Sequence, residues 1–458
     1  MTDIAHIDRG ARLERLELIV RDLLAEARRQ GASAAEAAAS FEAGLEINVR
    51  LGEVETVEHT RDNGLGITVY FGRRKGSSST SDLSPEAIRD AVAAACAIAS
   101  RTQEDPYAGL ADADLMARDI PDLDLYHPWD LEPDAAIELA IACEDVARAH
   151  DPRIVNSEGA NVSTHAGLHV YGNSHGFVAG YPSTRHGLSC AVVAQAGESM
   201  QRDYWWTTAR AAAGLESPEA VGQRAAERTV ARLGARQLPT QKAPVLFSPL
   251  MAAGLLRAFT GAISGSSLYR RSSFLLDRLD SRIFPDFVRI HEVPHLPRAL
   301  GSAPFDGDGV ATRAKDLVSQ GVLRTYLLDA YSARRLGLTT TGNAGGVHNL
   351  HVVPGALGTA SFSGPLDRAA MLQALGTGLF VTELLGHGTN PVTGDYSRGA
   401  AGFWVEKGEI AFPVEEITIA GNLKDMFLGL VAVGDDCDFP GSTRTGSWLI
   451  PEMTIAGD

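Results

Sequence analysis

The chain has 458 residues, 45% of them hydrophobic and 21% charged, which is typical of a soluble protein with two or three folding units. Its 57 acidic residues against 41 basic ones give a formal net charge of −16, which disfavours nonspecific binding to nucleic acid. The amino terminus contains acidic residues, and no apolar run approaches the ~18 residues of a membrane span. The four cysteines are widely spaced. These features favour the cytoplasm over secretion or a membrane.

The first hundred residues predict a helix, antiparallel strands and a second helix. Apolar residues recur at helical spacing from Leu13 to Ala27, and Gly31 follows as a stop signal. The stretches 45–51 and 67–71 alternate between apolar and other residues, as strands do. The segment 84–86, Ser-Pro-Glu, combines a cap, a proline at the first helical position and an acid near the positive end of the helix dipole. A helix should therefore begin there.

The next segment, 105–133, is rich in Asp, Pro and Ala and predicts a linker or an exposed connection. Beyond it the same order of elements returns, with a helix over 134–150, strands over 159–208 and a helix over 218–233. A helix, a meander and a helix therefore occur twice, within 11–104 and within 131–236. This suggests either an internal duplication or two similar lobes.

A domain boundary is predicted at 237–244, because two prolines in a short polar stretch disfavour both a helix and a central strand. In the remainder, frequent glycines and prolines separate short strands and few helices, which favours antiparallel sheet with long loops. We therefore assign the α+β class. The amino-terminal domain of helices and antiparallel meanders covers 1–236, and the mostly antiparallel β domain covers 237–458.

The stretch from Glu383 to Phe427 is the most informative part of the sequence. Its glycines stand where a chain turns tightly or where another backbone approaches closely, and they are Gly386, Gly388, Gly394, Gly399 and Gly402. Alternating apolar residues then predict a strand, a hairpin turn at Lys407-Gly408 and a further strand. Asn422 is placed to cap a short helix that follows.

This stretch resembles the carboxyl-terminal signature of the TldD/PmbA family, in which a strand enters a Gly-Asp-Tyr/Phe-Ser loop and leaves through a Gly-Asn-Leu helix start. Further landmarks of the family stand in the same order at 61–69, 244–247, 265–274 and 304–312. The resemblance is to the PmbA branch, also called TldE. It implies a subunit of a cytoplasmic hetero-oligomeric metalloprotease, with zinc in a TldD-type catalytic partner and unfolded or modified peptides as substrates.

The resemblance also implies where zinc would bind in a catalytic relative. The TldD branch uses a His-Glu-x-x-x-His helix, whose glutamate activates the metal-bound water. In this chain Gly261 matches the glycine of that motif. The match places Arg257 and Ala262 at the histidine positions and Ala258 at the glutamate position. Arginine stays charged and alanine has no ligating atom, so we expect no catalytic residue, metal or cofactor in this chain.

A second segment, His291-Glu-Val-Pro-His295, satisfies the HExxH pattern of many zinc proteases. The pattern binds metal only on a helix, where residues i and i+4 share one face. Pro294 would cost about 3 kcal/mol inside a helix, and the preceding 287–290 predicts a strand. We therefore expect a short strand that leaves through a proline loop. A self-sufficient metalloprotease using His291 and His295 is the alternative enzyme hypothesis.

The other histidines offer no convincing metal site. His165 and His169 would share one face of a strand, but at ~3.3 Å per residue they lie about 13 Å apart, too far for one ion. Cys437 stands in a late region where catalytic relatives carry a third ligand, yet one thiol without histidines binds no zinc. These residues are therefore expected to be surface or hydrogen-bonded side chains.

The loop from 386 to 398 is the candidate contact with a peptide or with the zinc-bearing partner. Its glycines would let an extended peptide approach the backbone and add as a strand, or they would simply hold tight turns in the sheet. The same alternatives apply to the glycines of 342–346. The residues assigned to the contact are Gly386, His387, Gly388, Gly394, Asp395, Tyr396 and Arg398. A peptide-binding homodimer without enzymatic activity is the remaining alternative for the whole chain.

Overall fold

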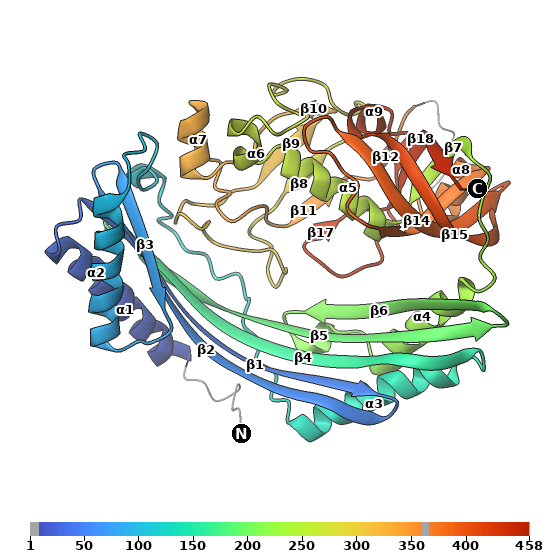
Figure 1. Ribbon diagram of the computed structural model, residues 1–458, viewed down its shortest axis with the longest axis horizontal. Coiled ribbons are helices and arrows are strands. Elements are labelled where there is room, and N and C mark those ends of the chain that lie inside the picture. The colour runs from blue at the N-terminus through green and yellow to red at the C-terminus, as the bar shows by residue number, and fades with distance from the viewer. Residues whose placement is uncertain (1–8, 359–365, 458) are drawn as a thin grey trace.

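The computed structural model describes residues 9–358 and 366–457, and it confirms the α+β class. Two parts face one another in Figure 1: a long, curved sheet with helices on its outer side, and a β-rich carboxyl-terminal part above its inner side. Within the described residues, no helix combines the length and the apolar character that crossing a bilayer requires.

One six-stranded antiparallel sheet contains the strands of both predicted meanders. Its strand order is β3-β2-β1-β4-β5-β6, so β1 and β4 pair at the centre, with Phe41 opposite Leu168. The two meanders therefore extend from the centre in opposite directions within one sheet. The strands are β1 (Ala34–Arg50), β2 (Glu53–Phe71), β3 (Arg74–Thr80), β4 (Ile154–Asn173), β5 (Val178–Ala196) and β6 (Ser199–Ala209).

Four helices cover one face of this sheet, as the sequence predicts. They are α1 (Arg9–Arg29), α2 (Pro85–Arg101), α3 (Pro133–Ala149) and α4 (Pro218–Ala231). Alternate residues of β1, from Ala35 to Val49, are buried against them in two clusters, one with α1 and α2 and one with α3 and α4. Ser84 caps α2, because its Oγ accepts a hydrogen bond from the Ala87 N–H at 3.2 Å. Such a cap stabilises a helix by about 1 kcal/mol.

The first strand begins earlier than its sequence predicts. Alternation predicts a strand over 45–51, whereas β1 begins at Ala34. Alanine favours helices, yet Ala35, Ala37 and Ala39 are almost fully buried in the cluster beneath α1 and α2. Their small side chains let the helices approach the sheet closely, and pairing with β2 and β4 supplies the backbone hydrogen bonds.

The connection between the two halves of this sheet, 105–133, is only partly the exposed linker that its composition predicts. It contains the 3-10 turn η1 (Ala113–Leu115) and otherwise runs extended. Leu110, Met116 and Leu125 are buried, and Met116 forms a β-bridge with Val310 of the carboxyl-terminal part. The expectation of full exposure is therefore wrong, since apolar side chains anchor the segment between the sheet and the carboxyl-terminal part.

The carboxyl-terminal part is built around a sheet that closes on itself. Its strand order is β12-β16-β18-β15-β14-β13-β7, and β7 also pairs with β18, which closes a ring of five strands. Large aromatic side chains, including Phe247, Phe427 and Trp448, fill the core and are fully buried. The strands are β7 (Gln241–Phe247), β12 (Gly355–Ala356), β13 (Gly378–Leu385), β14 (Asp395–Glu406), β15 (Glu409–Asn422), β16 (Ala432–Val433) and β18 (Trp448–Ala456).

A smaller five-stranded sheet and several short helices complete this part. The sheet has the order β10-β9-β8-β11-β17, with β8 (Ile290–Glu292), β9 (Lys315–Ser319), β10 (Val322–Leu323), β11 (Leu350–Val352) and β17 (Thr443–Arg444). The helices are α5 (Pro249–Ala262), α6 (Gly265–Tyr269), α7 (Ala330–Leu336), α8 (Arg368–Leu375) and α9 (Leu423–Leu428), and η2 (Ala212–Gly214) lies before α4.

Strand β7 contradicts the expectation that 237–244 disfavours a central strand. The strand includes Pro244 and pairs on both sides. Proline is tolerated there because the register of β18 shifts between Ile450 and Met453, opposite Pro244, so no partner needs the missing N–H. On the other side, pairing with β13 begins only at Val245.

The predicted hairpin and helix near the carboxyl terminus are confirmed. β14 and β15 pair around Lys407 and Gly408, whose φ values of 53° and 81° are those of a tight hairpin turn. Asn422 then caps α9, because its Oδ1 accepts a hydrogen bond from the Lys424 N–H at 3.0 Å. Both elements begin where the sequence places them.

Candidate functional site

Helix α5 lies where the family resemblance expects a zinc-binding helix, directly after β7. Leu255, Leu256 and Phe259 bury its apolar side in the carboxyl-terminal core. Arg257 is exposed, and Ala262 is only 3% exposed. Ala258 packs against the same core and is partly buried. The side chains at the three motif positions therefore provide one fixed positive charge and two methyl groups, none of which ligates a metal.

The HExxH segment does not form a helix. Ile290 to Glu292 form strand β8, three residues later than the strand that the sequence predicts, and a loop follows with Pro294 in it. His291 Nδ1 lies 2.5 Å from Asp316 Oδ1, whereas His295 Nε2 lies 2.9 Å from Thr312 Oγ1. The two histidines therefore have separate partners and lack the shared helical face that the motif requires.

The glutamate of this segment is committed to a buried network. Glu292 is fully buried, and its Oε2 lies 2.6 Å from Lys315 Nζ. Its Oε1 accepts hydrogen bonds from the His348 N–H at 2.8 Å and from Asn343 Nδ2 at 2.9 Å. Burial raises the pKa of Glu292, but the hydrogen bonds from His348 and the charge of Lys315 outweigh it and hold the pKa at about 2. Glu292 therefore stays ionised as part of the structure, and a carboxylate with so low a pKa is a weak base.

This network also explains the glycine loop at 342–346. Asn343 within the loop and His348 two residues after it hold the loop to β8 through Glu292. The loop is thus fixed to the second sheet by side chains from distant segments. Sequence spacing gave no signal for this network, because residues 292, 315, 343 and 348 follow no motif.

A second, partly buried acidic group lies where the amino-terminal sheet meets the carboxyl-terminal part. Glu36 of β1 accepts hydrogen bonds from Tyr70 Oη at 2.7 Å and from Tyr171 Oη at 2.9 Å. Asp308 of the carboxyl-terminal part accepts one from the Ala330 N–H at 2.9 Å. Burial raises the pKa of Asp308 to about 7, the Ala330 hydrogen bond opposes the rise, and the charges of Asp306 and Glu36 add to it. The family landmark at 304–312 thus lies against the inner face of the sheet.

The loop from 386 to 398 joins β13 to β14, and its glycines have clear structural reasons. Gly386 and Gly394 have φ values of +72° and +84°, which favour glycine. A Cβ on Gly388 would lie 1.4 Å from the Ser397 carbonyl oxygen. Asp395 fastens the loop, because it accepts hydrogen bonds from Thr393 Oγ1 at 2.6 Å and from Asn422 Nδ2 at 2.9 Å. These two hydrogen bonds lower the pKa of Asp395.

The polar side chains of this loop differ in their exposure. His387 and Asp395 are exposed, and Arg398 is partly buried, with its Nη2 3.3 Å from the Leu384 carbonyl oxygen. Tyr396 is only 3% exposed, its ring packs edge-on against Phe247, and burial raises its pKa to about 12. Tyr396 therefore has no free surface for a direct contact with a peptide, whereas the other three side chains do.

The remaining histidines are held by ordinary contacts. His165 Nε2 lies 3.7 Å from Glu42 Oε2, and His175 Nε2 lies 3.1 Å from the Ala111 carbonyl oxygen. Across residues 9–358 and 366–457, no group of three or more His, Cys, Asp or Glu side chains is arranged to hold a metal ion.

Three models of one family match the chain: PmbA/TldA metallopeptidase domain 1 at 35–99, its central domain at 126–233 and its C-terminal domain at 240–457. The chain is 52% identical to Metalloprotease PmbA of Escherichia coli O157:H7 over 92% of each chain. It is 49% identical to a Metalloprotease PmbA homolog of Haemophilus influenzae over 94% of each chain.

Solved structures share the same fold. A protein described as a modulator of DNA gyrase, from Bacteroides thetaiotaomicron, superposes with a TM-score of 0.89 at 27% identity, covering 96% of this chain and 99% of that one. TldE from Thermococcus kodakarensis superposes with a TM-score of 0.82 at 20% identity, covering 96% and 100%, which supports the fold. The chain belongs to the TldD/PmbA family of metallopeptidases, in its PmbA/TldE branch.

Proposed function

We propose that this chain is the subunit without catalytic zinc in a two-subunit cytoplasmic metallopeptidase that cleaves unfolded or modified peptides. A TldD-type partner supplies the zinc and the general base. The relatives named as metalloproteases support peptidase chemistry. The observation that carries the proposal is helix α5, which presents Arg257, Ala258 and Ala262 at the motif positions.

The packing around α5 leaves little room for a metal ligand at position 262. Ala262 and its neighbour Phe259 are buried in the core, so a histidine at 262 would have to displace packed side chains. The exposed Arg257 adds a positive charge, which would repel a zinc ion at this position. The alternative enzyme, built on His291 and His295, lacks both a helix and a free glutamate.

The surface beside the 386–398 loop supports a contact with a partner or a peptide. Leu385 and Val392 are 51% and 53% exposed there, so this surface presents two large apolar side chains to solvent. His387, Asp395 and Arg398 supply polar groups in the same loop. An apolar patch edged by polar groups is the usual composition of an interface.

Zinc analysis of the purified chain, alone and reconstituted with a TldD-type chain that carries an intact His-Glu-x-x-x-His motif, tests the proposal. After dialysis the chain alone should hold only traces of zinc and should not hydrolyse an unfolded peptide. The reconstituted complex should hold about one zinc per pair of chains and hydrolyse it. His291→Ala should change neither result.

The opposite result would identify the alternative enzyme. Zinc at about one ion per isolated chain, lost in His291→Ala or His295→Ala, would show that the HExxH segment rearranges to bind metal. Failure of the TldD-type chain to associate, measured by analytical ultracentrifugation, would remove the two-subunit part of the proposal.

A further inference from the structure

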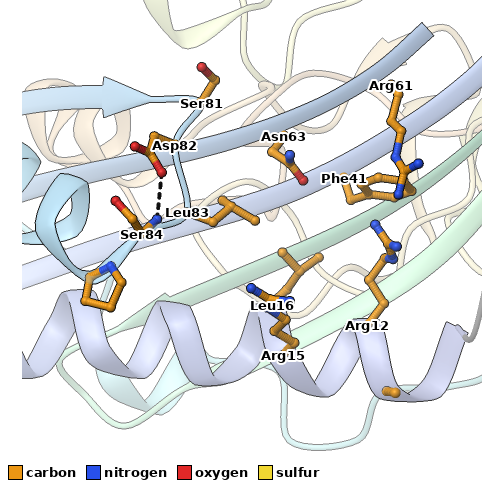
Figure 2. Close-up of a pocket in the computed structure, with 12 residues that line it drawn as sticks. Arg12, Arg15, Leu16, Phe41, Arg61, Asn63, Ser81, Asp82, Leu83 and Ser84 are labelled. Carbon is orange, nitrogen blue, oxygen red and sulfur yellow. Dashed lines mark hydrogen bonds between the residues drawn. The ribbon is translucent and has the colours of Figure 1, made fainter. Parts of the chain in front are cut away.

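A pocket of about 740 Å³ opens on the helix-covered face of the amino-terminal sheet (Figure 2). Helix α1 contributes Arg12 and Arg15, β1 contributes Phe41, and β2 contributes Arg61 and Asn63. The segment that enters α2, 81–85, forms the remaining wall. Phe41 and Glu36 lie on opposite faces of β1, because they are five positions apart and successive side chains of a strand alternate between its faces. The pocket therefore faces away from the contact with the carboxyl-terminal part.

Three arginines line this pocket, and no carboxylate among the described residues pairs with them. Within the described residues, no ion pair involves Arg12, Arg15 or Arg61. Arg12 Cζ lies 3.9 Å from the centre of the Phe41 ring. Figure 2 shows the guanidinium groups of Arg12 and Arg61 turned toward one another beside that ring. Burial, followed by the charges of Arg61 and Arg15, lowers the pKa of Arg12.

Asp82, the acidic residue in the lining, is engaged elsewhere. Its Oδ1 accepts a hydrogen bond from the Ser84 N–H at 2.8 Å, and Figure 2 shows its carboxylate directed toward Ser84 and away from the arginines. Asp82 thus shapes the turn into α2, and no ion pair among the described residues offsets the positive charge of the pocket. Side chains that repel one another in this way destabilise a fold unless a bound anion separates them.

The rest of the lining suits an anion with more than one charged group. Asn63 and Ser81 place neutral hydrogen-bonding groups on the sides of the pocket, and the amino-terminal end of the 17-residue helix α2 adds a partial positive charge. Leu16 and Leu83 provide apolar surface between them. Arginine binds carboxylate and phosphate through two parallel hydrogen bonds, so three arginines can hold a multiply charged ligand.

We propose that this pocket binds a small oxyanion ligand that carries at least two phosphate or carboxylate groups. The net charge of −16 repels such a ligand at long range, but screening by physiological salt limits the electrostatic effect of each charge to about 8–10 Å. The local excess of arginines therefore decides binding within the pocket. The site is independent of the peptidase assignment, because its residues belong to the opposite face of the amino-terminal sheet from the carboxyl-terminal part.

Isothermal titration calorimetry of the full chain with pyrophosphate and with tricarballylate, at constant ionic strength, tests the site. At least one of the two should bind saturably with one site per chain, and the one that binds identifies phosphate or carboxylate as the recognised group. Arg15→Gln and Arg61→Gln should each weaken that binding by about tenfold or more, as expected for one lost hydrogen bond between charged groups. Arg89→Gln, an exposed arginine of α2 outside the pocket, is the matched control and should leave binding unchanged.

A thermal midpoint separates loss of the site from loss of the fold. Without ligand, Arg61→Gln should melt no lower than the unaltered chain, because the substitution removes repulsion. With the ligand, the midpoint of the unaltered chain should rise with concentration, and Arg61→Gln should need about tenfold more ligand for the same rise. Failure of both anions to bind, or equal weakening in Arg89→Gln and Arg61→Gln, would overturn the proposal.

Discussion

Replacing Lys315 with methionine should destabilise the carboxyl-terminal part far more than the loss of a surface ion pair would. Glu292 is fully buried, and Lys315 Nζ lies 2.6 Å from its Oε2. Methionine has a similar length, but it leaves the carboxylate with the hydrogen bonds from His348 and Asn343 alone. Removing one partner of a buried ion pair costs about 3–5 kcal/mol, because the other charge stays buried and uncompensated.

The pKa of Glu292 gives a second measure of the same magnitude. A carboxyl group with a pKa of 4.5 when unfolded and about 2 when folded contributes roughly 3 kcal/mol to the free energy of unfolding at neutral pH. Because the folded pKa is depressed, this contribution is fully present above pH 4.5 and is lost as the pH falls towards about 2. The difference in the free energy of unfolding between the unaltered chain and Lys315→Met should therefore be largest near neutral pH and shrink across that acid range.

Thermal midpoints measured by calorimetry from neutral pH into this acid range provide the assay. The matched control is Arg324→Met, which removes an exposed ion pair to Asp280 of 3.3 Å and should cost at most about 1 kcal/mol. Adding Glu292→Gln to Lys315→Met should recover part of the loss, because it removes the stranded charge. Equal midpoints for Lys315→Met and Arg324→Met at neutral pH would refute the reasoning.

Two further predictions concern the candidate site. Gly388→Ala should lower the thermal midpoint, because its Cβ would lie 1.4 Å from the Ser397 carbonyl oxygen, whereas Gly66→Ala, with nothing within 4 Å, should not. An unchanged midpoint for Gly388→Ala, together with reduced proteolysis by the reconstituted complex, would instead indicate a direct peptide contact. The triple variant Arg257→His, Ala258→Glu and Ala262→His restores the family motif but should not by itself create a peptidase. Catalytic zinc also needs a third ligand and surroundings that orient the ligands. Hydrolysis of an unfolded peptide by this variant would contradict the prediction.

The parts of the fold that the sequence predicted well depend on local chemistry. The cap at Ser84, the hairpin at Lys407-Gly408 and the cap at Asn422 each follow from neighbouring residues alone. The alanine-rich start of β1 and the strand through Pro244 could not be predicted in this way. Both depend on distant partners, namely the helices that pack on the alanines and the register shift of β18 opposite the proline.

In the candidate site, too, local features could be predicted from the sequence, whereas features that depend on distant segments could not. The resemblance placed a helix after β7, and α5 is there. Glu292 was seen only as part of a motif, because Lys315 and His348 reach it from segments with no regular spacing. The inward direction of Tyr396 depends on where β14 begins, at Asp395, and strand boundaries are among the least certain sequence predictions.

The central pairing of β1 with β4 has a consequence for synthesis on the ribosome. Strand β1 can pair with β2 as soon as the first meander emerges, but its other edge stays unpaired until β4 has been made. At roughly 5–20 residues per second, the intervening hundred or so residues expose that edge for on the order of ten seconds. An open strand edge invites pairing with other chains, and in β1 every second residue is small or apolar. The nascent amino-terminal half therefore exposes a strand edge that is open to aggregation until β4 has been made.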